Sequence, residues 1–182
     1  MPPTKIVFLH GNDTMRWSYA WAPWLKRELD RVEVENIFET FPDSILARKK
    51  YWLAFLKEKV QADERTILVG HSSGATAAMR YAETEKVLGS VLIAPSYTDT
   101  EDALEKQSGY FDTPWRWERI RKNQQFIGLF YSKDDPYIPQ REFEHIKSKL
   151  RPETFVFQNR KHFMDETFPE LLEYLKEKTG ER

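Results

Sequence analysis

A serine between two glycines, at the junction of a predicted strand and a predicted helix, constrains this chain more than any other feature. Residues 66–69 (Thr-Ile-Leu-Val) form an uninterrupted apolar and β-branched run, which predicts a strand buried on both faces. Residues 75–81 are rich in alanine and free of Gly and Pro, which predicts a helix. Between them lies Gly70-His71-Ser72-Ser73-Gly74, whose glycines leave room for a sharp turn. Such a turn would strain the backbone of Ser72 and hold its hydroxyl clear of the sheet.

This arrangement resembles the nucleophile elbow of α/β-hydrolases, in which G-x-S-x-G joins a strand to a helix. The three fixed residues alone are weakly specific, because glycine and serine are common residues. The flanking strand and helix make the motif specific. An ordinary glycine-rich turn, whose serine only caps the following helix, is the alternative interpretation of this segment.

The composition predicts one soluble domain over residues 1–182, since 40% apolar residues can build a core and 31% charged residues can cover it. The net charge is −1, and Lys and Arg alternate with Asp and Glu along the chain. A nucleic-acid partner is therefore not expected, because affinity for phosphates needs a basic excess. The chain has no cysteine, which excludes disulfides, thiolate metal sites and cysteine catalysis.

The first residues enter a short apolar run that is too brief for a signal peptide, and no stretch reaches the length of a membrane span. We therefore expect a cytoplasmic protein that has no membrane partner.

Six apolar runs alternate with helical patterns, which predicts βαβ units. The expected strands are residues 5–9, 32–38, 66–69, 87–94, 126–131 and 154–157, and the expected helices are 17–30, 45–60, 75–81, 115–120, 140–150 and 166–178. Right-handed crossovers then give a compact single-domain α/β fold, a mostly parallel, doubly wound six-stranded sheet with helices on both faces. Residues 32–38 alternate with period two and are expected at an edge of the sheet. Residues 96–125 lack a strand and leave length for only a minimal cap.

A serine hydroxyl needs a base and a carboxylate that orients this base, and α/β-hydrolases supply them in the order Ser, acid, His. Four histidines compete for the role of base. His10 and His71 precede the candidate acids, and His145 lies in the middle of a predicted helix. His162 follows the last predicted strand, where catalytic loops gather in such sheets. The sequence therefore favours His162 as the base of Ser72.

Two neighbouring aspartates, Asp134 and Asp135, follow the strand at 126–131. Pro136 holds the residue before it extended, which favours Asp135 as the acid and leaves Asp134 to the turn. The oxyanion would be held by two backbone N–H groups, that of Ser73 after the nucleophile and that of Asn12 after His10-Gly11. The alternative is that Gly11 only turns the chain.

Longer motifs resemble a known family over nearly the whole chain. They are Gly70-His71-Ser72-Ser73-Gly74-Ala75, then Ser108-Gly109-Tyr110-Phe111 with Pro114-Trp115-Arg116-Trp117-Glu118, then Asp134-Asp135-Pro136. Together they resemble the retinoblastoma-binding protein 9 family of serine hydrolases. The resemblance implies a small α/β-hydrolase with Ser72, Asp135 and His162 as its triad. It also implies hydrolysis of small esters, including amino-acid esters, without a cofactor or metal.

One segment departs from the family's namesake, which carries a Leu-x-Cys-x-Glu motif for the retinoblastoma pocket. The matching residues 60–64 begin with Val60, end with Glu64 and have Ala62 in place of the cysteine. Both Leu and Cys are replaced, so we do not expect that partner.

The remaining expectations concern the pocket and two other functional classes. We expect Tyr97, Trp115 and Phe163 to line a small apolar pocket over Ser72, although packing against the sheet is the alternative role for each. An interaction protein on a hydrolase scaffold with a vestigial triad is one alternative function. A metal hydrolase that uses His10, Asp13 and His71 is the other, but their spacing does not match a metal-binding motif.

Overall fold

A fully parallel six-stranded sheet lies at the centre of the computed structural model, which describes residues 3–181. The strands are β1 (Lys5–Leu9), β2 (Glu35–Phe38), β3 (Thr66–His71), β4 (Gly89–Ile93), β5 (Phe126–Ser132) and β6 (Glu153–Phe157). Their order in the sheet is β2-β1-β3-β4-β5-β6, and every neighbouring pair is parallel. Strands β1, β3 and β4 are buried along their whole length, as continuous apolar runs predict, and β2 lies at an edge.

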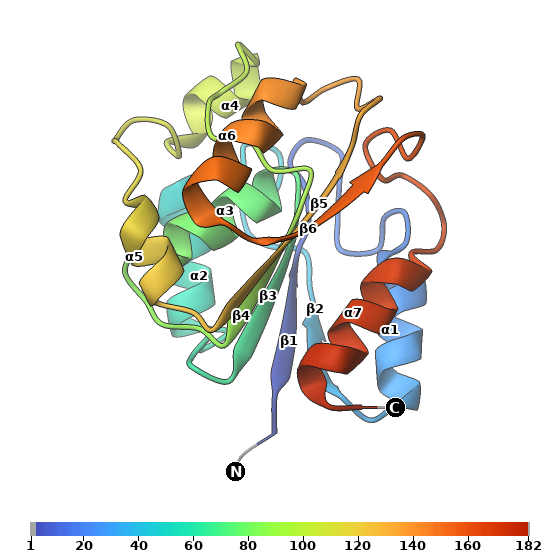
Figure 1. Cartoon of the computed structure of the whole chain (residues 1–182). Coiled ribbons are helices and arrows are strands. Elements are labelled where there is room, and N and C mark those ends of the chain that lie inside the picture. Colours follow the sequence, from blue (N-terminus) through green and yellow to red (C-terminus); the bar gives the residue numbers. More distant parts are fainter. Residues whose placement is uncertain (1–2, 182) are drawn as a thin grey trace.

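Helices cover both faces of the sheet, so the predicted doubly wound α/β fold is confirmed (Figure 1). They are α1 (Ala22–Arg31), α2 (Lys49–Glu58), α3 (Ser73–Ala82), α4 (Ala103–Ser108), α5 (Trp117–Lys122), α6 (Gln140–Leu150) and α7 (Pro169–Thr179). Helices α1 and α7 lie together on one face, and α2, α3, α5 and α6 lie on the other. Helix α4 stands above the carboxyl ends of the strands, at the top of Figure 1.

The two glycines of the serine motif allow α3 to pack unusually close to the sheet. A Cβ atom on Gly74 would lie 2.1 Å from the carbonyl oxygen of Leu9 in β1, and one on Gly70 would lie 2.5 Å from the backbone nitrogen of Ala75. Neither site can hold a larger residue unless the backbone moves. The close approach of α3 to β1 brings the residue after Ser72 next to the loop that follows β1.

Several elements differ from the prediction at their amino-terminal ends, and three of these differences have a local cause. Helix α1 begins at Ala22, with a proline in its first turn, and Trp17 lies in the preceding loop. Helix α2 begins only at Lys49, because residues 43–48 form a turn in which the Asp43 carboxylate accepts hydrogen bonds from Arg48. Strand β2 begins at Glu35, after a residue with positive φ at position 33.

Helix α4 was not predicted, although a capping residue that favours a helix end lies at each of its ends. The Asp102 carboxylate caps it by accepting hydrogen bonds from the backbone N–H groups of Leu104 (2.8 Å) and Glu105 (3.0 Å). The helix ends at Gly109, whose φ is +80°. It is short and polar, so it lacks the apolar periodicity on which the prediction relied. The predicted minimal cap is this one helix with its flanking loops.

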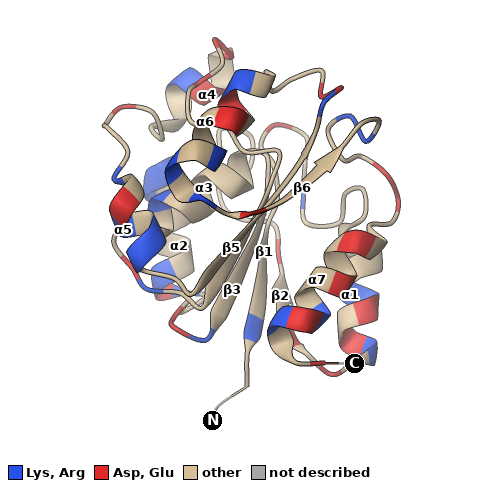
Figure 2. Ribbon diagram, in the orientation of Figure 1, with Lys and Arg blue, Asp and Glu red and all other residues tan. Residues whose placement is uncertain are grey.

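Acidic and basic residues alternate along α1, α5 and α7 (Figure 2). This is the arrangement that the alternation of charges along the sequence indicates. None of the helices within residues 3–181 has the length and apolar character needed to cross a membrane.

Candidate active site

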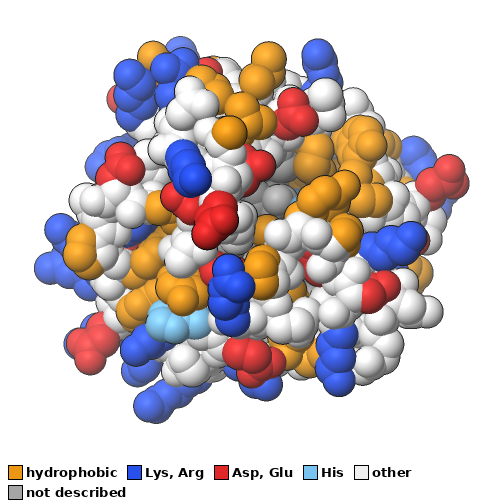
Figure 3. Space-filling view, turned by 90° about the horizontal axis from the view of Figure 1, so that it is seen from above, with side chains coloured by type: hydrophobic (Ala, Val, Ile, Leu, Met, Phe, Trp, Pro, Cys, Tyr) orange, Lys and Arg blue, Asp and Glu red, His pale blue; other side chains and the backbone are white. Residues whose placement is uncertain are grey.

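The loops at the carboxyl ends of four strands, together with the cap, enclose one cavity of about 530 Å³. Asn12 follows β1, Ser72 follows β3, residues 136–138 follow β5, and His162 follows β6. Residues 100–102, 104 and 105 of the cap complete the wall. Seen from above, the molecule is hollowed here, with hydrophobic side chains on one side of the hollow and acidic side chains on the other (Figure 3).

Ser72 has the strained backbone that the serine motif predicts. Its φ is 56° and its ψ is −122°, a conformation that residues other than glycine rarely adopt. The turn is held by hydrogen bonds on both sides, because the Ser72 N–H donates to the Ile93 carbonyl (2.9 Å) and the Ser72 carbonyl accepts from the Ala75 N–H (2.9 Å). The strain is therefore imposed by β4 and α3, and the serine lines the cavity at the amino-terminal end of α3.

His162 and Asp135 form a buried hydrogen-bonded pair. His162 Nδ1 lies 2.8 Å from Asp135 Oδ2, and the side chain of Asp135 is 0% exposed. The other oxygen, Oδ1, accepts hydrogen bonds from the backbone N–H groups of Tyr137 (2.8 Å) and Ile138 (3.0 Å). Because an ionised carboxylate only accepts, Nδ1 of His162 carries the proton and Nε2 is left as the basic nitrogen.

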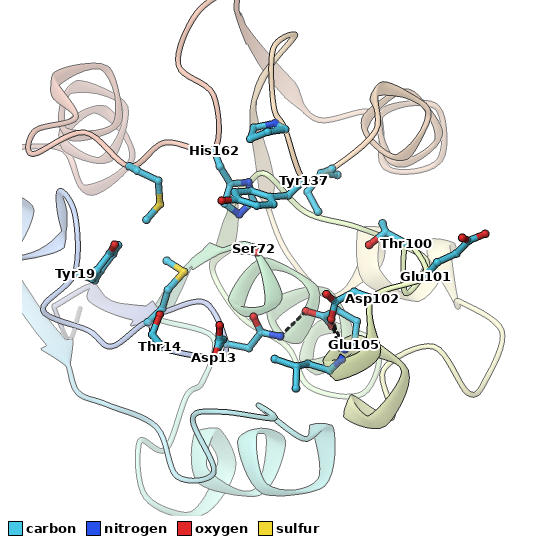
Figure 4. A pocket seen from close by; sticks show the side chains of 16 residues that line it. Asp13, Thr14, Tyr19, Ser72, Thr100, Glu101, Asp102, Glu105, Tyr137 and His162 are labelled. Carbon is cyan, nitrogen blue, oxygen red and sulfur yellow. Dashed lines mark hydrogen bonds between the residues drawn. The ribbon is translucent and has the colours of Figure 1, made fainter.

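The structure brings Ser72 and His162 to the same cavity (Figure 4). Within residues 3–181 no hydrogen bond joins the Ser72 hydroxyl to the His162 imidazole. Active sites without a bound substrate often close this hydrogen bond only in the substrate complex. The arrangement can therefore support nucleophilic attack once a substrate fills the cavity.

Asp134 has a different set of partners from its neighbour Asp135. Its Oδ1 accepts hydrogen bonds from the Ser132 hydroxyl (2.6 Å) and from the Lys161 N–H (2.9 Å). The hydrogen bond from Ser132 is the main cause that lowers the pKa of Asp134. The carboxylate lies on the surface, where it joins the β5 loop to the loop that carries His162.

His71 holds the backbone of the candidate base, a contact that the sequence did not predict. Its Nε2 lies 2.8 Å from the carbonyl oxygen of His162, so Nε2 carries the hydrogen and donates it. The ring is buried, and burial together with the nearby His162 lowers the pKa of His71 to about 3. His71 is therefore neutral near pH 7 and fixes the loop of His162 directly against the serine turn.

We expect the protein to lose stability as the pH falls from about 6.5 towards 3. Over that range the unfolded chain binds a proton on His71, while the folded chain does not, since its pKa is about 3. Burial also lowers the pKa of His10, which adds to the loss in the same direction. Thermal unfolding midpoints measured between pH 7 and pH 4 should fall less steeply for His71→Gln than for wild type. Equal slopes would contradict this assignment.

The backbone N–H groups of Asn12 and Ser73, the predicted oxyanion donors, have no acceptor within residues 3–181. Ser73 opens α3 directly after the nucleophile, and Asn12 lines the cavity. Their side chains have a common partner. Asn12 Nδ2 donates to Glu105 Oε1 (3.0 Å), and the Ser73 hydroxyl donates to the same oxygen.

The prediction that Tyr97, Trp115 and Phe163 line the pocket was wrong, because none of the three borders the cavity. Tyr97 stacks on His145, with ring centroids 4.0 Å apart. The Trp115 ring stacks on the guanidinium of Arg80, whose Cζ lies 3.6 Å from the centroid of the Trp115 ring. Phe163 is 0% exposed and packs inside the core. Each of the three rings therefore packs away from the cavity.

Two other groups of side chains line the cavity, and no periodic pattern in the sequence indicates either group. The apolar group is Met15, Tyr19, Tyr137, Ile138 and Met164; the acidic group is Asp13, Glu101, Asp102 and Glu105. No Lys or Arg of the described chain takes part in the lining. Tyr137 is 68% exposed, and its ring meets that of His162 edge-on at 5.0 Å. The cavity therefore offers one apolar side and one anionic side.

His10 does not take part in a metal site. Its Nδ1 donates to the Gly11 carbonyl (2.6 Å), and its Nε2 accepts from the Phe41 N–H (2.9 Å), so both ring nitrogens are occupied. Within residues 3–181 no group of three or more His, Asp or Glu side chains could hold a metal ion.

The sequence profile of a family described as Serine hydrolase matches residues 7–175. The chain is 38% identical over 178 residues to "Serine hydrolase RBBP9" of Rattus norvegicus. The matched region covers 96% of this chain and 95% of that protein. It is 24% identical over 172 residues to "Putative hydrolase YdeN" of Bacillus subtilis, covering 92% and 90%.

Solved structures show the same fold. The crystal structure of the ydeN gene product from B. subtilis matches with a TM-score of 0.88 at 20% identity, covering 98% of this chain and 100% of that one. Est1E from Butyrivibrio proteoclasticus matches with a TM-score of 0.76 at 13% identity, covering 96% and 86%.

Proposed function

This chain belongs to the serine hydrolase family and is therefore a hydrolase, and from that premise we propose that it cleaves small esters through Ser72, His162 and Asp135. The observation that carries the proposal is the His162–Asp135 pair, which faces the same cavity as a serine on a strained turn. Amino-acid esters or amides are the substrate class that we propose within this activity.

The proposed reaction passes through an acyl-enzyme. His162 Nε2 takes the proton of the Ser72 hydroxyl as the oxygen attacks the ester carbonyl, and Asp135 stabilises the imidazolium. The oxyanion is held by the backbone N–H groups of Asn12 and Ser73 and by the positive end of α3. The imidazolium returns its proton to the leaving alcohol, and water then releases the acid by the same two steps.

The acidic side of the cavity supports amino-acid esters as substrates. Four carboxylates, those of Asp13, Glu101, Asp102 and Glu105, line it, without a basic residue among the lining side chains. An ammonium group on the substrate is attracted by this field, whereas a neutral acylamino group is not. The apolar side is left for the substrate's side chain or alcohol.

We expect alanine ethyl ester to be hydrolysed at least tenfold better, in kcat/KM, than N-acetylalanine ethyl ester. Tenfold corresponds to about 1.4 kcal/mol of differential binding, which is more than one exposed ion pair supplies but is within reach of the combined field of the four carboxylates. The ratio should shrink at high salt, because three of the four carboxylates, those of Asp13, Glu101 and Asp102, are exposed to solvent. Equal rates for the two esters at low salt would remove the support for this substrate class.

We also expect kcat/KM on p-nitrophenyl esters to be highest for acetate to butyrate and lower for octanoate. The cap is one six-residue helix with its loops, so a long acyl chain would lie partly in water. Each methylene contributes about 0.8 kcal/mol only when it is buried. A rate that still rises at dodecanoate would indicate a deep apolar channel and contradict this expectation.

We further propose that residues 60–64 do not bind the retinoblastoma pocket. Val60, at the position of the motif's leucine, is buried, and its carbonyl accepts a hydrogen bond from Lys5 Nζ (3.0 Å). The Ala62 carbonyl accepts one from the Tyr81 hydroxyl (2.8 Å). The segment is therefore fixed to the body of the domain, in addition to lacking the Leu and Cys of the motif.

A further inference from the structure

One carboxylate of the cap accepts hydrogen bonds from both segments that carry the proposed oxyanion donors. Oε1 of Glu105, in α4, accepts a hydrogen bond from the side chain of Asn12 (3.0 Å) and another from the hydroxyl of Ser73. Figure 4 shows Glu105 on the wall of the cavity that contains Ser72. Asn12 belongs to the loop after β1, and Ser73 is the first residue of α3.

From this geometry we propose that Glu105 is a positioning residue of the oxyanion hole. Its carboxyl oxygen bridges the Asn12 and Ser73 side chains and thereby sets the spacing of their backbone N–H groups. This inference rests on the proposed function, and it concerns how the cap controls the same site. In this role Glu105 acts as a hydrogen-bond acceptor, and its negative charge is not required.

The spacing matters because an oxyanion hole acts only when both donors point at the position of the developing negative charge. A donor that is removed typically costs a factor of about 10² to 10³ in kcat. A donor that is displaced should cost less. The two donors, Asn12 and Ser73, are 61 residues apart in sequence, so a side chain that is hydrogen-bonded to both is a direct means of fixing their relative position.

The surroundings of Glu105 are unfavourable for a carboxylate that serves only to stabilise the fold. Its second oxygen, Oε2, is buried and has no hydrogen-bond partner within residues 3–181. Burial is the main cause that raises the pKa of Glu105, while the hydrogen bond from Ser73 opposes this shift. Placing a carboxylate with one unpaired oxygen here costs folding free energy, as is common for residues that serve activity.

The segment that follows α4 in the cap is hydrogen-bonded to α3. The buried guanidinium of Arg80 donates to the carbonyl oxygens of Tyr110 (2.7 Å) and Thr113 (2.7 Å) and pairs with Glu83 (2.8 Å). Tyr110 follows α4 by two residues. The segment carrying Glu105 is therefore anchored to the same helix that begins at Ser73, so the bridge has a fixed base.

The test compares Glu105→Ala and Glu105→Gln with wild type on a short ester. We expect Glu105→Ala to lower kcat about tenfold or more with KM within about twofold, because the oxyanion exists only in the transition state. Glu105→Gln keeps an acceptor oxygen and should recover most of the loss. Affinity for a trifluoromethyl ketone, whose adduct with serine carries an oxyanion, should fall in parallel with kcat. Lys106→Ala, in the same helix but exposed, is the matched control.

Asn12→Ala removes one arm of the bridge and keeps the backbone N–H. It should lower kcat, and adding Glu105→Ala should lower it little further, because both changes break the same bridge. Asn12→Ala and Ser73→Ala each remove one of the two hydrogen bonds without changing Glu105, so lowered kcat in both supports the proposal, and unchanged kcat in both contradicts it, even where Glu105→Ala folds poorly.

Three results would overturn the proposal while wild-type activity and its dependence on Ser72 stand. They are unchanged kcat in Glu105→Ala, a loss confined to KM, and equal losses in Glu105→Ala and Glu105→Gln. Additive losses for Asn12→Ala and Glu105→Ala would also overturn it. A wild-type protein whose turnover survives loss of the Ser72 hydroxyl would instead refute the proposed function itself.

Discussion

Ser72→Ala is expected to abolish ester turnover and labelling by a fluorophosphonate while the fold is kept. Loss of the nucleophile in a serine triad lowers kcat by a factor on the order of 10⁶. The turn should survive, because it is held by backbone hydrogen bonds to Ile93 and Ala75 and by the close packing of Gly74 on β1. The thermal midpoint should stay within about 2 °C of wild type, since the change removes one hydroxyl at the cavity surface.

Ser73→Ala is the matched control, because its proposed oxyanion donor is the backbone N–H. It should lose about tenfold in kcat at most, through the bridge to Glu105. Equal losses in Ser72→Ala and Ser73→Ala would mean that the nucleophile is misassigned. A folded wild-type protein that neither labels nor turns over esters would favour the alternative of an interaction protein on a hydrolase scaffold.

Asp135→Asn is expected to lower kcat about 10⁴-fold, while Asp134→Asn leaves it close to wild type. An amide beside His162 Nδ1 favours the wrong imidazole tautomer, which is the known effect of this change in serine triads. Asp134 only accepts hydrogen bonds, from Ser132 and Lys161, and the amide oxygen of asparagine can accept both. The measurement is single-turnover acylation of each variant with p-nitrophenyl acetate.

The opposite ranking of the two variants would contradict the assignment of Asp135. So would a kcat for His162→Ala that remains close to wild type. Circular dichroism and the thermal midpoint of each variant separate a loss of chemistry from a loss of fold. Because Asp135 also accepts two backbone N–H groups, some loss of stability in Asp135→Asn is expected alongside the kinetic effect.

The sequence alone predicted the sheet, its edge strand and the strained serine turn. These features depend on local patterns, such as the buried run at residues 66–69 and the glycines on either side of Ser72. Chain order and the position of Pro136 also led to the choice of His162 and Asp135. Such patterns succeed because strands, helices and tight turns are set largely by residues that are neighbours in sequence.

Only the tertiary structure decided which side chains surround Ser72. Trp115 lies over Arg80 of α3, and the Trp21 indole donates a hydrogen bond to the Phe163 carbonyl (3.0 Å) from 142 residues away. No local pattern in the sequence encodes these partners. The same holds for Glu105, which is one of 29 acidic residues in the sequence. Its role follows from the fold, since parallel strands bring the loop after β1, the start of α3 and the cap to one edge of the sheet.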